Sequence, residues 1–163
     1  MKVSMTNSNR GLGLELSKRF KDVVEGFDNT SDIFINNRHN SFNQTKLLMK
    51  AFEEWKDSEK TIVNIVSRSK YPNISKGYMY SASKAALSHL SNNLRLLSDK
   101  KCRIIDINPG LLESNLPSLS YSEVADVVEY CIKLPIHIEI GEISVWNKTP
   151  YNVVSKLKDE RKN

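Results

Sequence analysis

The sequence predicts a single α/β domain with three layers, in which helices cover both faces of a sheet of about five mainly parallel strands. Short apolar runs of strand length alternate with longer segments whose apolar residues recur every three or four positions. This alternation is typical of strand–helix–strand units around a parallel sheet. A length of 163 residues suits one domain with its own core. We expect that domain over residues 1–150, followed by a charged C-terminal tail over 151–163.

The apolar patterns place the elements along the chain. The predicted strands are 2–6, 32–36, 61–67, 102–108 and 136–146, the last with a break allowed at Gly141. The predicted helices are 11–26, 44–57, 80–98 and 122–134. Pro135 marks the end of the fourth helix, because proline cannot continue an α-helix.

Composition narrows the classes of location and partner. Hydrophobic residues make up 39% of the chain, no apolar run is long enough to cross a bilayer, and MKVSMTNSN turns polar too early for a secretory signal. Cys102 and Cys131 lack the spacing of a redox or metal site, which favours reduced core thiols. The histidines also lack metal-ligand spacing. We therefore expect a cytoplasmic protein without a metal site or membrane contact.

The basic excess is small and spread along the chain. Lys and Arg number 24 against 19 Asp and Glu, giving a net charge of +5, and only the C-terminal KLKDERKN concentrates charge. A basic patch is the usual mark of a nucleic-acid surface. The sequence therefore does not imply nucleic-acid binding, and the tail is most simply a solvated helix end.

Polar segments follow the first four predicted strands. They are TNSNRGLG, NNRHN, SRSKYPNISKGYMY and NPGLLES, all rich in small or polar residues. In open parallel sheets, ligands bind beyond the carboxyl ends of the strands. We therefore expect these segments to converge on one ligand site.

The most informative pair is Tyr80 and Lys84. A spacing of four stacks the phenol and the ammonium on one face of a helix, where the positive charge favours the phenolate. Such a tyrosine can exchange protons near neutral pH. A Tyr-x-x-x-Lys pair by itself is more often a solvated surface pair than a catalytic one, so its surroundings decide its meaning.

Those surroundings resemble the short-chain dehydrogenase/reductase family. YSASKAAL is similar to the active-site helix of that family almost letter for letter. Ser67, at the end of the strand TIVNIVS, lies 13 positions before Tyr80, which is the interval between serine and tyrosine in the family. The resemblance implies that Ser67, Tyr80 and Lys84 are catalytic.

The fourth catalytic residue that the resemblance implies is an asparagine. Asn40 lies 27 positions before Ser67, close to the family's interval for its catalytic asparagine. Asn36, Asn37 and Asn43 lie near enough that they remain alternatives to Asn40.

Three further segments match in the family's order. TNSNRGLG is similar to Thr-Gly-x-x-x-Gly-x-Gly, DIFINNRH to a strand ending in Asn-Asn-Ala-Gly, and INPGLLES to a strand followed by Pro-Gly and a later threonine. Each motif alone has an ordinary structural explanation as a turn or cap. Together they imply an abridged Rossmann-like fold with a site for NADP or NAD. The residues that the resemblance assigns to this site are Thr6, Arg10, Gly11, Leu12, Gly13, Asn36, Tyr80, Lys84, Pro109, Gly110, Leu112 and Ser114.

The first half of the chain departs from the family pattern. Only 18 residues separate Gly13 from Asp32, which is room for about one helix. We therefore expect the second and third family strands to be deleted and the first strand to lie at an edge of the sheet. The deleted segment normally carries the group that reads the adenosine ribose, and the sequence offers no evident replacement. Asn7 replaces the first glycine of the turn, and Arg38 and His39 replace Ala-Gly. We therefore expect weak cofactor binding.

The resemblance implies an oxidoreductase that moves a hydride between nicotinamide C4 and a carbonyl compound or secondary alcohol. Tyr80 would be the general acid, and Lys84 would favour its phenolate and hold the nicotinamide ribose. Ser67 would polarise the carbonyl, and Asn40 would support a water relay to Lys84. The short segment LLESNLPSLSYS gives little to enclose a ligand, so a small or exposed carbonyl substrate is expected.

Two other interpretations stay open. The chain could be a degenerate, non-catalytic binding or interaction module, because fold does not secure function. The retained catalytic set favours the enzyme, whereas the loss of the adenosine half favours the module. A gene fragment or shortened isoform that folds poorly is also compatible with the internal gaps.

The resemblance also implies a homodimer through helices 44–57 and 80–98. The outer faces of these helices are expected to carry Leu48, Phe52, Trp55 and Ser88, which could form an isologous four-helix contact. The alternative is that these aromatic residues only cover the sheet.

Overall fold

The computed structural model describes residues 1–72, 77–149 and 156, and within them the strands form one parallel sheet. Its six strands follow the order β2-β1-β3-β4-β5-β6. They are β1 (Val3–Met5), β2 (Val23–Glu25), β3 (Ile33–Asn36), β4 (Thr61–Ile65), β5 (Arg103–Pro109) and β6 (Glu142–Val145). The predicted α/β class with parallel strands is confirmed. The tail predicted over 151–163 lies outside the described residues except for residue 156.

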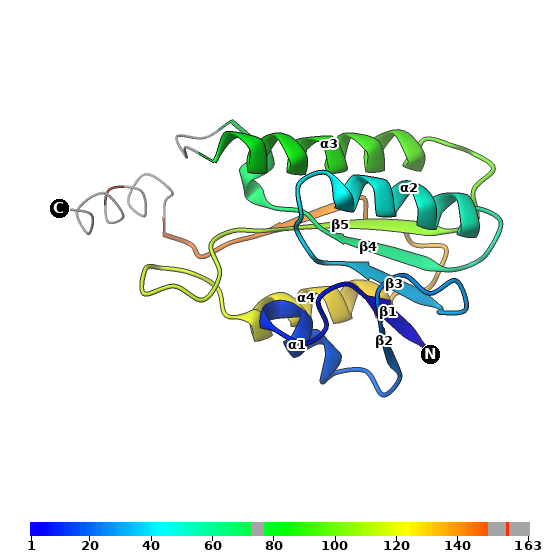
Figure 1. Cartoon of the computed structure of the whole chain (residues 1–163), viewed down its shortest axis with the longest axis horizontal. Coiled ribbons are helices and arrows are strands. Elements are labelled where there is room, and N and C mark those ends of the chain that lie inside the picture. The colour runs from blue at the N-terminus through cyan, green and yellow to red at the C-terminus, as the bar shows by residue number, and fades with distance from the viewer. Residues whose placement is uncertain (73–76, 150–155, 157–163) are drawn as a thin grey trace.

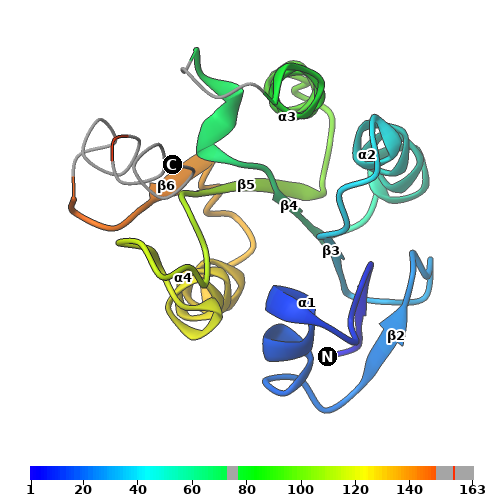
Figure 2. The ribbon, with the colours of Figure 1, turned by 60° about the vertical axis from the view of Figure 1, so that its left-hand side comes forward.

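Helices cover both faces of this sheet. They are α1 (Gly11–Ser17), α2 (Asn43–Trp55), α3 (Tyr78–Arg95) and α4 (Tyr121–Lys133), and a short 3₁₀ turn η1 (Arg68–Lys70) follows β4. Figures 1 and 2 show α2 and α3 on one face and α1 and α4 on the other. The sheet is therefore the middle of three layers, and the last three predicted helices are confirmed to within a few residues.

The apolar side of α2 packs against the sheet. Leu48 and Trp55 have no exposed surface, Phe52 is 5% exposed, and all three belong to one core cluster with Phe34 of β3. Ser88 of α3 is also buried. An amphipathic helix buries its apolar stripe against the core, so the expectation that these residues form an outer dimerisation face is wrong.

The first half of the chain holds a strand that the sequence did not predict. The predicted helix over 11–26 ends at Ser17, and Val23–Glu25 forms β2, which pairs in parallel with β1. Two adjacent β-branched valines favour a strand. Gly26 follows it with a φ of 85°, where the strand conformation ends, and its N–H donates to the carbonyl of Met5. The expectation that the first strand is an edge is therefore wrong, because β2 forms that edge.

The last predicted strand is shorter than expected. Of residues 136–146, only Glu142–Val145 forms β6, so the break allowed at Gly141 is where the strand begins. A Cβ on Gly141 would lie 3.3 Å from Nε of Arg95. The carbonyl of Gly141 accepts the N–H of Asp106. The residues before Gly141 therefore form a turn that leads into the strand.

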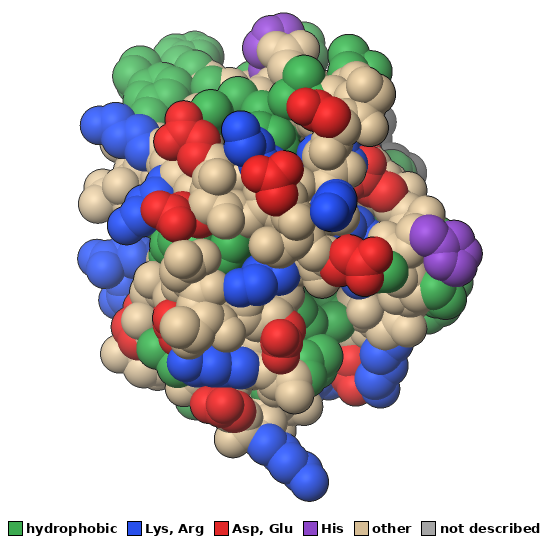
Figure 3. Space-filling model, turned by 90° about the vertical axis from the view of Figure 1, so that its right-hand side faces the viewer, with side chains coloured by type: hydrophobic (Ala, Val, Ile, Leu, Met, Phe, Trp, Pro, Cys, Tyr) green, Lys and Arg blue, Asp and Glu red, His purple; other side chains and the backbone are tan. Residues whose placement is uncertain are grey.

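The loops at the amino ends of the strands form the right-hand side of the molecule in Figure 1. Figure 3 faces this side and shows Lys and Arg side chains interspersed with Asp and Glu. Two ion pairs join loops there, Lys2 with Asp28 and Lys100 with Glu139. In the described part of the chain, no helix is long and apolar enough to span a bilayer.

A buried arginine fastens the end of α4 to the sheet. Arg103, in β5, is 3% exposed. Its guanidinium donates to Oγ1 of Thr61 and to four backbone carbonyls that close α4 and the turn after it. The accepting carbonyl oxygens belong to Ile132, Leu134, Pro135 and Ile138, at distances of 2.9–3.2 Å. The negative end of a helix favours a cation at this place, so the helix end and these carbonyls stabilise the charge together with the carboxylate of Glu139.

We predict that Arg103→Met lowers the free energy of unfolding by about 3 kcal/mol, because buried carbonyls lose their donor. Urea denaturation followed by circular dichroism would measure the change. Lys133→Met is the matched control, since Lys133 is 71% exposed at the end of the same helix. Equal losses in the two variants would contradict a structural role for the Arg103 guanidinium.

Candidate active site

The polar segments noted in the sequence lie at one edge of the sheet. Each follows one of the neighbouring parallel strands β1, β3, β4 and β5, so all four begin at the carboxyl ends of these strands. Helix α3 also begins at this edge, beyond η1. The expected place for ligand chemistry in such a sheet is therefore built from these segments.

Tyr80 and Lys84 lie one turn apart near the start of α3. Tyr80 is 37% exposed, whereas Lys84 is 2% exposed, and the Lys84 ammonium lies 5.5 Å from the centre of the Tyr80 ring. The ammonium donates to Oε1 of Gln44 at 2.7 Å and to the carbonyl of Ile65 at 2.8 Å. Burial lowers the pKa of Lys84 to about 7. This amine can therefore give up and regain a proton near neutral pH.

Ser67 is held at the end of β4. Its side chain caps η1, with Oγ accepting the N–H of Ser69 at 3.0 Å, and Ser67 is 8% exposed. The hydroxyl proton is not used in this bond, so it can be donated to another acceptor. Because Lys84 binds the carbonyl of Ile65, two residues earlier, the serine and the lysine share this strand end.

A histidine in the turn between β3 and α2 contacts Tyr80. The rings of His39 and Tyr80 lie edge to face, with centres 4.6 Å apart. Burial and the charge of Lys84 lower the pKa of His39. Asn40, the predicted catalytic asparagine, is exposed beside it, and its carbonyl accepts the N–H of Asn43 at 2.9 Å. The sequence marked His39 only as a replacement for a small residue of the Asn-Asn-Ala-Gly motif, and its adjacency to Asn40 was the available signal for a place beside Tyr80.

Thr6 joins the turn after β1 to the end of β3. Its Oγ1 accepts the N–H groups of Asn37 at 3.0 Å and Arg38 at 2.7 Å. Both donors belong to the segment that resembles Asn-Asn-Ala-Gly. The hydroxyl of Thr6 therefore shapes the site by fixing two loops against each other.

The turn itself needs its unusual residues. Asn7 and Gly11 have φ values of 65° and 54°, in the left-handed region that asparagine and glycine tolerate best. A Cβ on Gly13 would lie 1.8 Å from the carbonyl oxygen of Asn7, so only glycine fits there. Leu12 is buried in the core, which leaves its backbone alone to meet a ligand.

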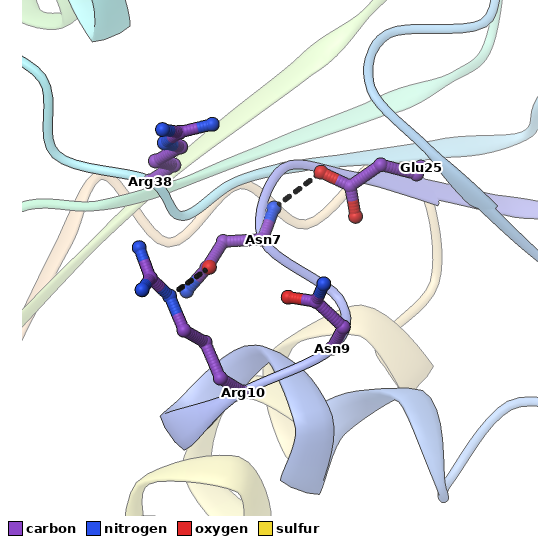
Figure 4. Close-up of a pocket in the computed structure, with 5 residues that line it drawn as sticks. All are labelled: Asn7, Asn9, Arg10, Glu25 and Arg38. Carbon is purple, nitrogen blue, oxygen red and sulfur yellow. Dashed lines mark hydrogen bonds between the residues drawn. The ribbon is translucent and has the colours of Figure 1, made fainter.

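A pocket of about 240 Å³ opens beside this turn, and Figure 4 shows its lining. The lining residues are Asn7, Asn9, Arg10, Glu25 and Arg38. Nε of Arg10 donates to Oδ1 of Asn7 at 2.7 Å. Two guanidinium groups therefore share this pocket with one carboxylate.

The carboxylate of Glu25 binds the turn after β1. It accepts the N–H groups of Asn7 at 2.7 Å and Ser8 at 2.8 Å. Burial would raise the pKa of Glu25, but the hydrogen bonds from Ser8 and Asn7 outweigh it and lower the pKa. The sequence showed no acidic or basic residue in place of that of the deleted segment, but the structure puts the Glu25 carboxylate at the end of β2, beside the turn. The sequence analysis did not single out Glu25 because it did not predict the strand β2.

The segment after β5 is fixed by close backbone contacts. Gly110 donates its N–H to the carbonyl of Val145, and a Cβ on Gly110 would lie 2.7 Å from Cβ of Trp146. Pro109 ends β5, and Leu112 packs against the core on the α1 and α4 side. Oγ of Ser114 accepts the N–H of Leu116 at 3.2 Å. These residues lie at the same edge as Lys84.

Asn36 does not present its side chain at this edge. It has no exposed surface, and its amide donates to the carbonyl of Gln44 at 2.8 Å and to Oδ1 of Asn64 at 3.1 Å. Gln44, which the sequence did not single out, contacts both Asn36 and Lys84. Its place in the first turn of α2 carried no motif, so only the structure reveals it.

Comparison with known proteins identifies the class. The model of the short chain dehydrogenase family matches residues 9–123, and the chain therefore belongs to this family. An uncharacterized oxidoreductase of Staphylococcus saprophyticus is 29% identical over 94 residues, which cover 52% of this chain. The match spans 40% of the length of that relative.

Solved structures share the fold. Serine dehydrogenase from Escherichia coli is 19% identical with a TM-score of 0.75, and the match covers 92% of this chain and 99% of that one. An alcohol dehydrogenase from Thermococcus sibiricus, solved with 5-hydroxy-NADP, is 15% identical with a TM-score of 0.75, and the match covers 92% and 98% of the two chains. At these identities the likeness shows the Rossmann-like architecture.

We predict that Gly13→Ala lowers the free energy of unfolding by about 3 kcal/mol, because the new methyl group overlaps a backbone oxygen that cannot move aside. Chemical denaturation would measure the loss. Gly26→Ala is the control, since Gly26 has a φ of 85° but nothing within 4 Å of its Cβ position. That variant should lose only about 1 kcal/mol from backbone strain, and equal losses would contradict the steric explanation.

Proposed function

We propose that the protein is an NAD(P)-dependent oxidoreductase that interconverts a small carbonyl compound and its alcohol. The observation that carries this proposal is the buried Lys84 ammonium, with a pKa of about 7, lying 5.5 Å from the centre of the Tyr80 ring. Ser67 lies two residues beyond Ile65, the last residue of β4, whose carbonyl Lys84 contacts. Membership of the short chain dehydrogenase family supports the same chemistry.

The residues beside the turn fit a dinucleotide. Arg10 and Arg38 line the pocket and suit phosphate oxygens, whereas the ionised Glu25 suits the hydroxyls of a ribose. Glycine at position 13 lets α1 start against the turn, as in other dinucleotide sites. When bound, the nicotinamide would supply or accept the hydride.

The side chains at the carboxyl ends of the strands transfer the proton and bind the carbonyl oxygen. The Tyr80 hydroxyl gives its proton to the forming alcohol oxygen, and Ser67 donates a hydrogen bond to the same oxygen. Lys84 favours the phenolate that remains. Asn40 lies in an exposed turn, from which it supports the return of a proton from solvent. The 37% exposure of Tyr80 supports a small or open substrate site.

One observation favours a second candidate function, a non-catalytic binding module. The N–H groups of Asn7 and Ser8 already bind Glu25, so the turn is satisfied without a pyrophosphate. A cofactor that needs these donors would have to displace the carboxylate, and its affinity would fall. The effect of removing the Tyr80 hydroxyl separates the two functions, because a non-catalytic module does not use this hydroxyl.

Location and assembly follow as further parts of the proposal. Cys102 and Cys131 are buried free thiols, which supports a reducing cytoplasmic location. A homodimer through α2 and α3 remains a prediction. It would have to use surface residues such as Met49, because the aromatic residues of α2 are buried against the sheet.

We predict that Tyr80→Phe lowers turnover of small aldehydes, ketones or quinones by about a hundredfold to ten-thousandfold, because the proton donor is lost. Cofactor affinity should change little, since the ribose contact rests on Lys84. Absorbance of NADH and NADPH would follow turnover. The free energy of unfolding should fall by no more than about 1 kcal/mol.

Tyr78→Phe is the matched control for this variant, because Tyr78 lies on the same helix and is 74% exposed. It should keep full activity. If the wild-type protein binds neither cofactor and turns over no carbonyl compound, or if Tyr80→Phe keeps its activity, the non-catalytic function replaces the enzyme.

We also propose that Glu25 makes NAD the preferred cofactor, because its carboxylate repels the 2′-phosphate of NADP. Glu25→Gln should shift the ratio of NADP to NAD affinity toward NADP by about tenfold or more. Calorimetry with both cofactors would measure the ratio. Glu54→Gln, an exposed change on α2, is the control, and an unchanged ratio in Glu25→Gln would refute this role.

A further inference from the structure

A buried chain of hydrogen bonds runs beneath α2 and α3, from Lys84 to Asp106 in β5. Lys84 binds Oε1 of Gln44 at 2.7 Å, and Nε2 of Gln44 binds the carbonyl of Asn36 at 2.7 Å. Nδ2 of Asn36 binds Oδ1 of Asn64 at 3.1 Å, and Nδ2 of Asn64 binds Oδ1 of Asp106 at 2.9 Å. Each of these five residues is at most 2% exposed.

Each amide in this chain can take only one orientation. The Gln44 amide nitrogen faces two carbonyls, those of Asn36 and Ile65. A flip would place its oxygen against both acceptors and its nitrogen against the Lys84 ammonium. Asn36 is fixed in the same way, because its nitrogen faces the carbonyl of Gln44 and Oδ1 of Asn64. The side-chain oxygen of Asn36 has no hydrogen-bond partner among the described residues, but both atoms of the Gln44 amide are paired, so the neighbours hold the Gln44 oxygen toward Lys84.

The far end of the chain is an acceptor that fixes the last amide. Oδ1 of Asp106 accepts from Asn64 and from the hydroxyl of Ser91 at 2.9 Å, and Arg95 approaches its Oδ2 at 3.4 Å. The nitrogen of Asn64 therefore points to the carboxyl oxygen of Asp106, and the oxygen of Gln44 points to the ammonium of Lys84. Burial raises the pKa of Asp106, whereas the charge of Arg95 and the hydrogen bonds from Asn64 and Ser91 act to lower it. Each end of the chain therefore meets an amide dipole of the favourable sign.

We propose that Gln44, oriented by Asn36, Asn64 and Asp106, is the positioning residue for the Lys84 ammonium. Its side-chain oxygen and the carbonyl of Ile65 take two of the three ammonium hydrogens and hold the nitrogen under the Tyr80 ring. The third hydrogen then points away from these two acceptors, available to a ribose or to the tyrosine hydroxyl. Gln44 itself touches no reacting atom.

Few titratable groups surround this ammonium in the described residues. Tyr80 faces it from the same helix, and His39 faces it from the turn before α2. The acceptors from α2 and β4 are neutral, namely the amide of Gln44 and the carbonyl of Ile65. A charge introduced at position 44 would therefore act on Lys84 at hydrogen-bond distance.

The test follows the titration of Lys84 itself, by NMR of protein labelled with ¹³C and ¹⁵N at the lysine Cε and Nζ. The Lys84 signal is the one that Lys84→Met removes. Gln44→Glu keeps the acceptor oxygen and adds a negative charge, so the titration midpoint of Lys84 should rise by more than one pH unit. Gln44→Met removes the acceptor, so the midpoint should fall.

Met49→Glu is the matched control, because it adds the same charge to the exposed side of α2. It should leave the midpoint within about 0.3 pH units of the wild type, far less than a contact charge produces. If Gln44→Glu moves the midpoint no further than Met49→Glu, the positioning role is wrong. The comparison of Gln44→Glu with Met49→Glu does not depend on Gln44→Met being folded.

The consequence for turnover rests on the proposed function, whereas the titration needs neither cofactor nor substrate. With an active enzyme, the pH profile of turnover in Gln44→Glu should shift in the same direction as the Lys84 midpoint. A shifted midpoint in a protein without turnover supports the positioning role and overturns the proposed enzyme. Turnover with an unshifted midpoint overturns the positioning role alone.

Discussion

The burial of the Lys84 ammonium is the constraint on which the rest of the site depends. A charge removed from water must be met by acceptors, and here they come from the end of β4 and the first turn of α2. This requirement ties three elements together at the carboxyl edge of the sheet. The same burial lowers the pKa of the amine to about 7, so the protonation of Lys84 in the proposed mechanism would change near neutral pH.

In the shortened first half of the chain, very few residues form the edge of the sheet and bind the turn after β1. One three-residue strand, β2, pairs with β1 and ends in Glu25. The carboxylate of Glu25 accepts two N–H groups of the turn after β1. The strand therefore gives the sheet a new edge and gives the turn an acceptor for its N–H groups. Arg10 and Arg38 stand beside this carboxylate, so the pocket has both signs of charge.

The sequence predicted the parallel sheet and the Tyr80–Lys84 pair because both rest on long periodic patterns or on fixed spacing. It missed β2, since three residues are too few for a visible alternation and the preceding helix pattern continued into them. It assigned Asn36 to the cofactor, but that amide is wholly buried. Gln44 belongs to no motif and His39 departs from one, so only the tertiary contacts show their place beside Lys84 and Tyr80.

The buried amide chain also bears on whether the fold serves only as a scaffold. A scaffold gains nothing from a buried ammonium, because apolar residues of similar shape in place of a buried polar set are often neutral or stabilising. Here Lys84 lies at one end of the chain and Asp106 at the other, and each intervening amide is oriented to suit them. The free-energy cost of this arrangement is explained if the charge at Lys84 acts on Tyr80. Packing between the sheet and α3 could be achieved without it.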